Sequence, residues 1–175
     1  WKRVTGVQTC ALPISPVRRM LAAGVPVGAG TDATRVASYN PWTCLSWLVT
    51  GRTVGGAALY PEENRLTRVE ALRTFTEGSA WFSREESRKG RLAPGYFADL
   101  AVLSEDYFHV APERIRGIES VLTILGGKVV HGTGPFATLA PPPRCVAPEW
   151  SPVRYYGGHS GATGSGGGAS VANGP

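Results

Sequence analysis

The distribution of large apolar side chains limits the size of any fold that these 175 residues can form. The last stretch, Gly157–Pro175, consists mainly of glycine, serine and alanine and offers almost nothing to bury. Without buried apolar surface the entropy lost on ordering is not offset, so we expect residues 135–175 to be an extended, Pro/Gly-rich and largely disordered tail. The hydrophobic core must therefore come from residues 16–134, which is room for one domain of ordinary size or less.

Charge and composition indicate which kinds of partner the chain is expected to bind. The net charge is +5, but the basic residues are scattered and often lie near an acid, so we expect a solvated surface and no nucleic-acid partner. No apolar run reaches the length of about 18 residues that a membrane span needs, so we expect no membrane partner. The chain has three cysteines and no CxxC pair: Cys10, Cys44 and Cys145. This pattern indicates neither a disulfide framework nor a zinc knuckle, so we expect a reducing compartment, with the cytoplasm as the default.

The first fifteen residues have neither a helical nor an alternating apolar period. Their segment VTGVQTCALPI, Val4–Ile14, is similar to the in-frame translation of a short-read sequencing adapter. We therefore expect residues 1–15 to be a non-native, adapter-like segment and leave them out of the fold reasoning. The alternative is an irregular N-terminal arm.

A helix, a tight turn and a short apolar run precede the first candidate functional residue. The pattern of Pro16–Gly24 predicts the end of a helix that Gly24 stops in a left-handed conformation. The following Val25–Gly30 predicts a buried parallel strand. A polar residue at the C-terminal end of such a strand is typical of catalytic groups in α/β barrels and doubly wound sheets, which makes Asp32 a candidate. The alternative role of Asp32 is a helix cap or turn former.

Two helices are predicted next. The first, Pro41–Thr50, has Asn at its N-cap and Pro in its first turn. The second, Leu66–Phe75, begins with a capping box formed by Thr67 and Glu70. Its apolar face continues for several residues past a glycine, which indicates a helix with a break or a second short helix.

Strand-like patterns dominate after Lys89. A strand is predicted at Ala98–Leu103, and a hairpin is predicted from Ser120–Leu125 and Lys128–His131 around a Gly-Gly turn. Three strands without intervening helices indicate a small β-domain or a sheet edge beside the α/β part.

This order of elements resembles a known family. The segments GTDAT, YNPW, LTRVEALRTFTEGSAW, KGRLAPGYFADLAVL and VLTILGGKVVHG together are similar to the C-terminal portion of the metal-dependent amidohydrolase superfamily, specifically its amidohydrolase 3 group with YtcJ-like proteins. The resemblance covers residues 16–134, and KGRLAPGYFADLAVL and the Gly-Gly hairpin are its most specific parts.

The resemblance implies a fold and an activity. The fold class is α/β: residues 16–88 would be the end of a TIM barrel, with its last strand and helices, and residues 89–134 part of a composite β-sandwich domain. The activity would be hydrolysis of non-peptide carbon–nitrogen bonds in a small-molecule, amide-type substrate. Asp32 would be the catalytic proton shuttle at the end of the last barrel strand.

The resemblance also implies a divalent metal, with zinc favoured, in the complete parent protein. The family's metal ligands would lie upstream of Pro16, so Asp32 is the one position here that could face or bind the metal. Three histidines lie after the barrel part without ligand spacing, and we expect surface or packing roles for them: His109, His131 and His159. A catalytic zinc takes about three protein ligands, so we expect this fragment to bind no metal and to be inactive by itself.

A barrel fragment would leave its strand edges and apolar helix faces uncovered. We therefore expect aggregation, with the faces of Trp42–Val49 and Leu66–Phe82 exposed. Two other readings stay open. One is a non-catalytic small β-domain that acts as a binding module and takes a ligand without metal. The other is a basic nucleic-acid-binding domain, whose affinity would fall steeply with salt.

Overall fold

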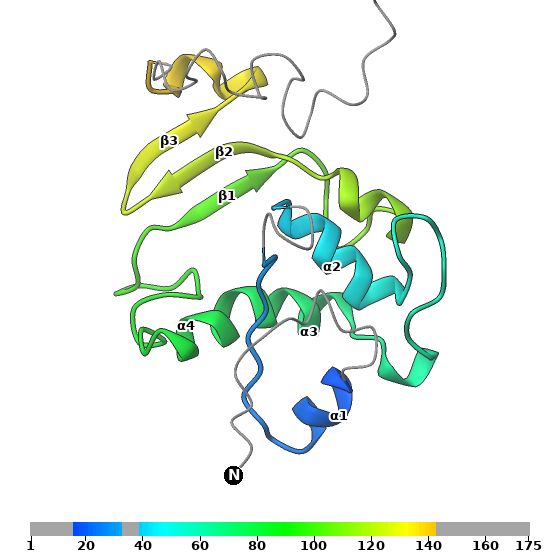
Figure 1. Cartoon of the computed structure of the whole chain (residues 1–175). Coiled ribbons are helices and arrows are strands. Elements are labelled where there is room, and N and C mark those ends of the chain that lie inside the picture. Colours follow the sequence, from blue (N-terminus) through cyan, green and yellow to red (C-terminus); the bar gives the residue numbers. More distant parts are fainter. Residues whose placement is uncertain (1–15, 33–38, 143–175) are drawn as a thin grey trace, which may run out of the picture. The chain divides into compact units, whose positions relative to one another are not determined.

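Short helices precede a small sheet in the part of the chain that the structure describes. The computed structural model describes residues 16–32 and 39–142, and these elements belong to one unit that ends at Pro141. Helices α1 to α4 come first along the chain, and strands β1 to β3 follow (Figure 1). Segments 1–15 and 143–175, with the predicted adapter-like stretch and most of the predicted tail, lie outside the described residues.

Helix α1, Val17–Ala22, ends as its sequence predicts. Gly24 has a φ of 71°, and the N–H groups of Gly24 and Val25 donate to the carbonyls of Leu21 and Met20 at 3.0 and 2.9 Å. These two bonds form a Schellman motif, which uses the left-handed glycine to satisfy the last helical carbonyls.

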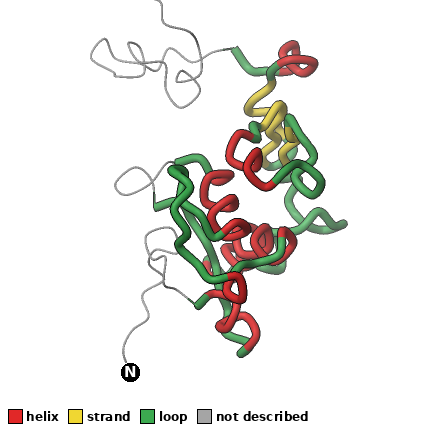
Figure 2. The backbone as a smooth tube through the Cα atoms, turned by 90° about the vertical axis from the view of Figure 1, so that its right-hand side faces the viewer, coloured by secondary structure: helices red, strands yellow, loops and turns green. Residues whose placement is uncertain are grey.

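The predicted strand at Val25–Gly30 is wrong. The segment runs as loop from Val25 to Asp32, and the strands drawn in Figure 2 all come later in the chain. The physical reason is that within residues 16–32 and 39–142 no strand pairs with this segment. The backbone N–H and C=O groups of Ala29 instead form hydrogen bonds with helical residues. Val25 is 42% exposed, so the segment is not the buried parallel strand that its apolar run indicated.

Helix α2, Pro41–Thr50, has the predicted bounds. The Asn40 side chain accepts the N–H of Trp42 at 2.9 Å, and Gly51 ends the helix with a φ of 66°. Its apolar face packs on the 3₁₀ turn η3, Pro112–Gly117, instead of lying exposed. Leu45 is 2% exposed, which corrects the expectation of an uncovered α2 face.

Helices α3, Arg68–Arg73, and α4, Ser79–Phe82, are joined by a π-helical turn, η2, Thr74–Gly78. The capping box predicted at Thr67 is present, and the predicted break takes the form of this π turn. Because the turn stays helical, α3, η2 and α4 follow one another without a gap, and we call Arg68–Phe82 the rod.

The sheet is antiparallel with the order β1-β2-β3. Strand β1, Leu100–Leu103, pairs with β2, Ser120–Leu125, which turns through the predicted Gly-Gly hairpin into β3, Lys128–Gly132. Ala101 lies opposite Thr123, and Thr123 lies opposite His131. The hairpin prediction is confirmed, and β1 starts two residues later than expected.

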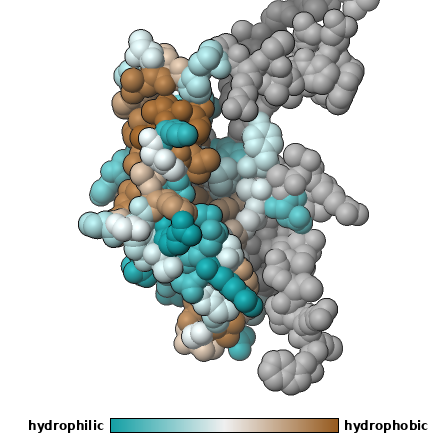
Figure 3. Space-filling model, turned by 90° about the vertical axis from the view of Figure 1, so that its left-hand side faces the viewer, coloured by the Kyte–Doolittle hydropathy of each residue, from teal (hydrophilic) through white to brown (hydrophobic). Residues whose placement is uncertain are grey.

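A compact core joins the helices to the loops around the sheet. Its buried members include Val17, Leu45, Leu48, Leu66, Ala71, Tyr107, Ile115 and Ile118. Apolar surface remains on the outside, as Figure 3 shows for one face. Among the exposed side chains are Val102, Leu125 and Val130 on the sheet and Trp81 and Phe82 on α4. The described helices include none long and apolar enough to cross a bilayer.

Candidate functional site

Asp32 lies at the end of the extended segment that follows α1. Its side chain is exposed, and its φ of 49° places it in the left-handed region of backbone space. Asp is one of the few non-glycine residues found there, and such conformations are concentrated in turns and functional sites. The structure therefore gives the predicted catalytic residue an unusual backbone conformation together with access to solvent.

The segment before Asp32 is bound to the helical rod. The N–H of Ala29 donates to the carbonyl of Thr74 at 2.9 Å. The hydroxyl of Ser79 lies 2.9 Å from the carbonyl oxygen of Ala29 and 3.1 Å from that of Thr74, and it can donate to either. Both backbone polar groups of Ala29 are thus satisfied by the rod rather than by a neighbouring strand.

Two glycines allow the segment to lie close to the rod. A Cβ built on Gly78 would lie 2.1 Å from the carbonyl oxygen of Val27, a separation that real Cβ atoms do not show. A Cβ on Gly28 would lie 2.7 Å from Cδ2 of the Phe82 ring. We call Ala29, Thr74, Gly78 and Ser79 the clamp. The sequence pattern indicated a break near Gly78 but none of these contacts.

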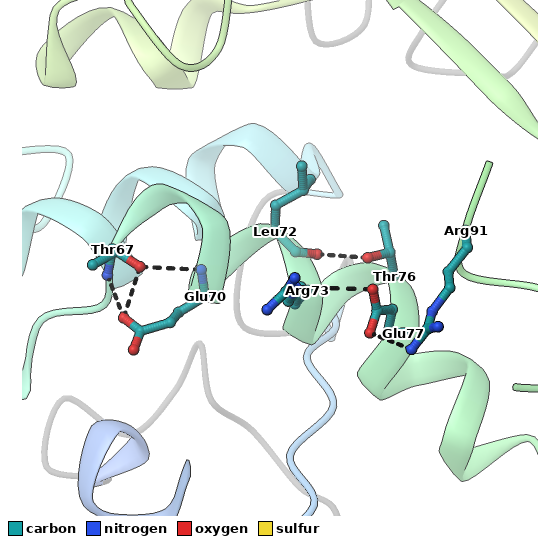
Figure 4. A network of polar contacts seen from close by, with 7 residues as sticks. All are labelled: Thr67, Glu70, Leu72, Arg73, Thr76, Glu77 and Arg91. Atoms are coloured by element: carbon teal, nitrogen blue, oxygen red, sulfur yellow. Dashed lines mark hydrogen bonds and ion pairs between the residues drawn. The ribbon is translucent and has the colours of Figure 1, made fainter. Parts of the chain in front are cut away.

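Polar contacts hold the rod at its start and near its middle (Figure 4). At its start the Thr67 N–H donates to Glu70 Oε2 at 2.7 Å, and the Glu70 N–H donates to Thr67 Oγ1 at 3.2 Å. The Thr67 N–H holds the pKa of the Glu70 carboxyl below its usual value, and the Thr67 hydroxyl adds to this effect. Near its middle, Glu77 pairs with Arg73 at 3.8 Å and with Arg91 at 3.1 Å.

A second set of contacts ties the start of α3 to the loop before η3. Tyr107 is 2% exposed, and its hydroxyl donates to the carbonyl of Arg68 at 3.0 Å. In return the Arg68 guanidinium donates to the carbonyls of Tyr107 and Val110. Burial raises the pKa of Tyr107 to about 12, so the phenol stays protonated and remains a hydrogen-bond donor even in moderately alkaline solution.

The described residues do not form a metal centre by themselves. No group of three His, Cys, Asp or Glu side chains within residues 16–32 and 39–142 could hold an ion. His109 contacts Asp106 at 2.7 Å between Nδ1 and Oδ2, and this contact lowers the pKa of Asp106. His131 lies exposed on β3, and His159 lies outside the described residues. A single carboxylate at Asp32 is fewer than the three protein ligands of a catalytic zinc, so the described part alone does not fit one.

Two hollows in the described surface are separate from Asp32. One, of about 410 Å³, lies beside α1 and α3 and is lined in part by Arg18, Glu70, Arg73 and Glu77. The other, of about 160 Å³, lies between α2, the following loop and η3. Asp32 lines neither of these two hollows.

Comparison with known proteins identifies relatives of this chain. The amidohydrolase family matches residues 2–131, which is more than half of the 175 residues. The chain is 38% identical to YtcJ of Bacillus subtilis, which carries the name of an amidohydrolase, over 72 residues, or 41% of this chain and 14% of YtcJ. It is 34% identical to the N-substituted formamide deformylase of Arthrobacter pascens over 116 residues, or 66% of this chain and 21% of the deformylase.

A further relative is the imidazolonepropionase of Anaeromyxobacter dehalogenans, with 35% identity over 129 residues, or 71% of this chain and 27% of that enzyme. The chain thus spans between 14% and 27% of the length of these relatives. No solved structure matches the chain. The resemblance read from the sequence motifs is confirmed by the family match: the chain belongs to the amidohydrolase family.

Proposed function

We propose that the complete protein containing this chain hydrolyses a non-peptide carbon–nitrogen bond in a small amide-type substrate, with Asp32 as its proton-transfer residue. The family match over residues 2–131 carries this proposal. Two of the relatives are named for N-substituted formamides and imidazolonepropionate, which are small molecules. The position of Asp32, exposed after a helix and an extended segment, supports its role.

The chemistry assigned to Asp32 is general base and acid catalysis. As a carboxylate, its oxygen can accept a proton from the attacking water and then return it to the departing nitrogen. Such a residue needs access to the reacting atoms, and the exposed side chain of Asp32 gives it that access. Positioned proton transfer of this kind contributes about 10²- to 10⁴-fold to a rate.

The divalent metal of the proposal, with zinc favoured, requires ligands from parts of the protein other than the described residues. For this reason we assign no step to the metal here. Activity of the 175-residue chain alone is not expected, because one carboxylate cannot hold the ion.

The test begins with the source DNA, which is sequenced upstream of the codons for Ile14 to Val17 until a start codon is reached. The complete protein is then purified, its metal content is measured, and formate release from N-(4-nitrophenyl)formamide and turnover of imidazolonepropionate are assayed. Asp32→Asn should lower kcat by at least about 100-fold. Asp106→Asn, the same substitution at another exposed aspartate, should leave kcat within about twofold. Full activity in the Asp32→Asn protein would refute the assigned role.

A further inference from the structure

The π-helical turn η2, Thr74–Gly78, is the least ordinary element of the described fold. Well under 1% of residues in globular proteins adopt this conformation, and its single turns occur frequently at functional sites. Here the turn joins α3 to α4 at the place where the segment leading to Asp32 crosses the rod.

A carbonyl of this turn accepts a hydrogen bond from outside the rod. In a regular α-helix the carbonyl of Thr74 would be used by the N–H four residues later. In η2 its oxygen accepts the N–H of Ala29 at 2.9 Å, from a segment more than forty residues earlier in the chain. The buried position of Thr74, at 2% exposure, protects this bond from water.

Ser79 completes the attachment. Its hydroxyl lies 2.9 Å from the carbonyl oxygen of Ala29. Ala29 is thus bound through its carbonyl by Ser79 as well as through its N–H by Thr74. Gly78 contributes by having no side chain, so the carbonyl of Val27 can occupy the space that a Cβ would fill. Residues 27–29 are therefore fixed by both hydrogen bonds and close packing.

Asp32 follows Ala29 by three residues, so its Cα can lie no more than about 11 Å along the chain from the fixed point. Its left-handed φ of 49° is unfavourable for a non-glycine residue and persists where the surroundings hold it. The clamp therefore holds the chain three residues before Asp32.

We propose that Ser79 is a positioning residue for Asp32: through its bond to Ala29 it sets the place and conformation of the proton-transfer carboxylate. This inference rests on the proposed function. A misplacement of about 1 Å at a reacting group can lower a rate by as much as 100-fold. Loss of one of several attachments should therefore lower kcat while leaving substrate binding nearly unchanged.

The main test uses the complete protein with N-(4-nitrophenyl)formamide as the probe. Ser79→Ala should lower kcat about tenfold with KM within about twofold. Ser83→Ala is the matched control, because the hydroxyl of Ser83, the C-cap of α4, donates at 2.9 Å to the carbonyl of Ala80 in that helix. Ser79→Cys replaces the hydroxyl by a thiol, which is larger and a weaker donor, so its kcat should fall between those of the other two proteins.

Two comparisons separate this inference from the proposed function. If Ser79 acts through Asp32, adding Ser79→Ala to Asp32→Asn should change the remaining kcat by less than about twofold. Amide hydrogen exchange at Ala29 in the complete protein gives a readout that does not depend on activity: Ser79→Ala should speed it and Ser83→Ala should not.

The outcomes are distinct. The inference is overturned if Ser79→Ala leaves kcat unchanged. It is also overturned if Ser79→Ala lowers kcat by the same factor in the wild-type and in the Asp32→Asn background. A protein that keeps its activity after Asp32→Asn overturns the proposed function, and unchanged exchange at Ala29 after Ser79→Ala overturns the clamp itself. If Ser79→Ala does not fold, the Ser79→Cys protein decides by the same kcat and exchange criteria.

Discussion

Replacing Gly78 by alanine tests whether helix propensity or the packing of Val27 against Gly78 has the larger effect on stability. Glycine inside a helix is less favourable than alanine by about 0.5–1 kcal/mol, because glycine loses more backbone freedom on folding. Considered as an isolated helix, the rod should therefore become more stable on Gly78→Ala. The structure predicts the opposite sign.

The added methyl group would lie 2.1 Å from the carbonyl oxygen of Val27, where contacts of 3.4 Å or more are ordinary. The segment would have to move away by roughly 1 Å, which would strain or break the Ala29 to Thr74 hydrogen bond. Overpacking of this kind costs about 1–3 kcal/mol. After subtraction of the gain in helix propensity, we expect Gly78→Ala to lower the free energy of unfolding by about 1–2 kcal/mol.

Urea unfolding followed by circular dichroism measures this change. With a slope of about 2 kcal/mol per molar urea, the midpoint should fall by about 0.5–1 M. Gly117→Ala is the matched control: Gly117 ends η3, and a Cβ there would meet no atom within 4 Å. Its midpoint should stay near that of the wild type. A Gly78→Ala chain that is as stable as the wild type, or more stable, would refute the close approach of the segment to the rod.

Two further predictions concern stability. Leu45→Ala should lower the free energy of unfolding by about 2–5 kcal/mol, because Leu45 is 2% exposed, whereas Leu92→Ala at a 75% exposed position should change it by less than about 0.5 kcal/mol; thermal unfolding of both variants checks this. Glu70→Gln tests the capping box through pH. Because the folded pKa of Glu70 is lowered, its stabilising effect is present above the unfolded pKa and is lost as the pH falls through the folded pKa. The stability difference between wild type and Glu70→Gln should therefore be largest above about pH 5 and should shrink toward pH 3; urea midpoints across this range measure it, and a difference that does not vary with pH would contradict the role of the charge.

The sequence predicted best those features that depend on neighbours in the chain. The Asn-Pro start of α2, the Thr67–Glu70 capping box and the Gly-Gly hairpin each join residues within four positions of one another, so their signals are local. The strand predicted at Val25–Gly30 failed because strand formation depends on a partner that the sequence of the strand does not specify. Apolar composition alone could not show that Ala29 is bound by a helix.

The same limit applies to the candidate site. Asp32 is a candidate because of its place after an apolar run, which is a local signal, and its catalytic role stays a prediction. Ser79 could not be found in this way, because its contact with Ala29 spans 50 positions of sequence. The available signal was indirect: a Gly-Ser pair inside an apolar helical pattern, which favours a break but does not say what lies against it.

The place of Asp32 therefore depends on how firmly the rod is held. The ion pairs of Glu77 involve side chains that are 35% or more exposed, and such pairs contribute about 0–1 kcal/mol each. Stronger restraint comes from burial of Ala71 at 0% and Thr74 at 2% exposure, next to the carbonyl that binds Ala29. The attachment point is thus anchored in the hydrophobic core rather than by the exposed charges. For this reason substitutions of the surface ion pairs should disturb Asp32 much less than Ser79→Ala does.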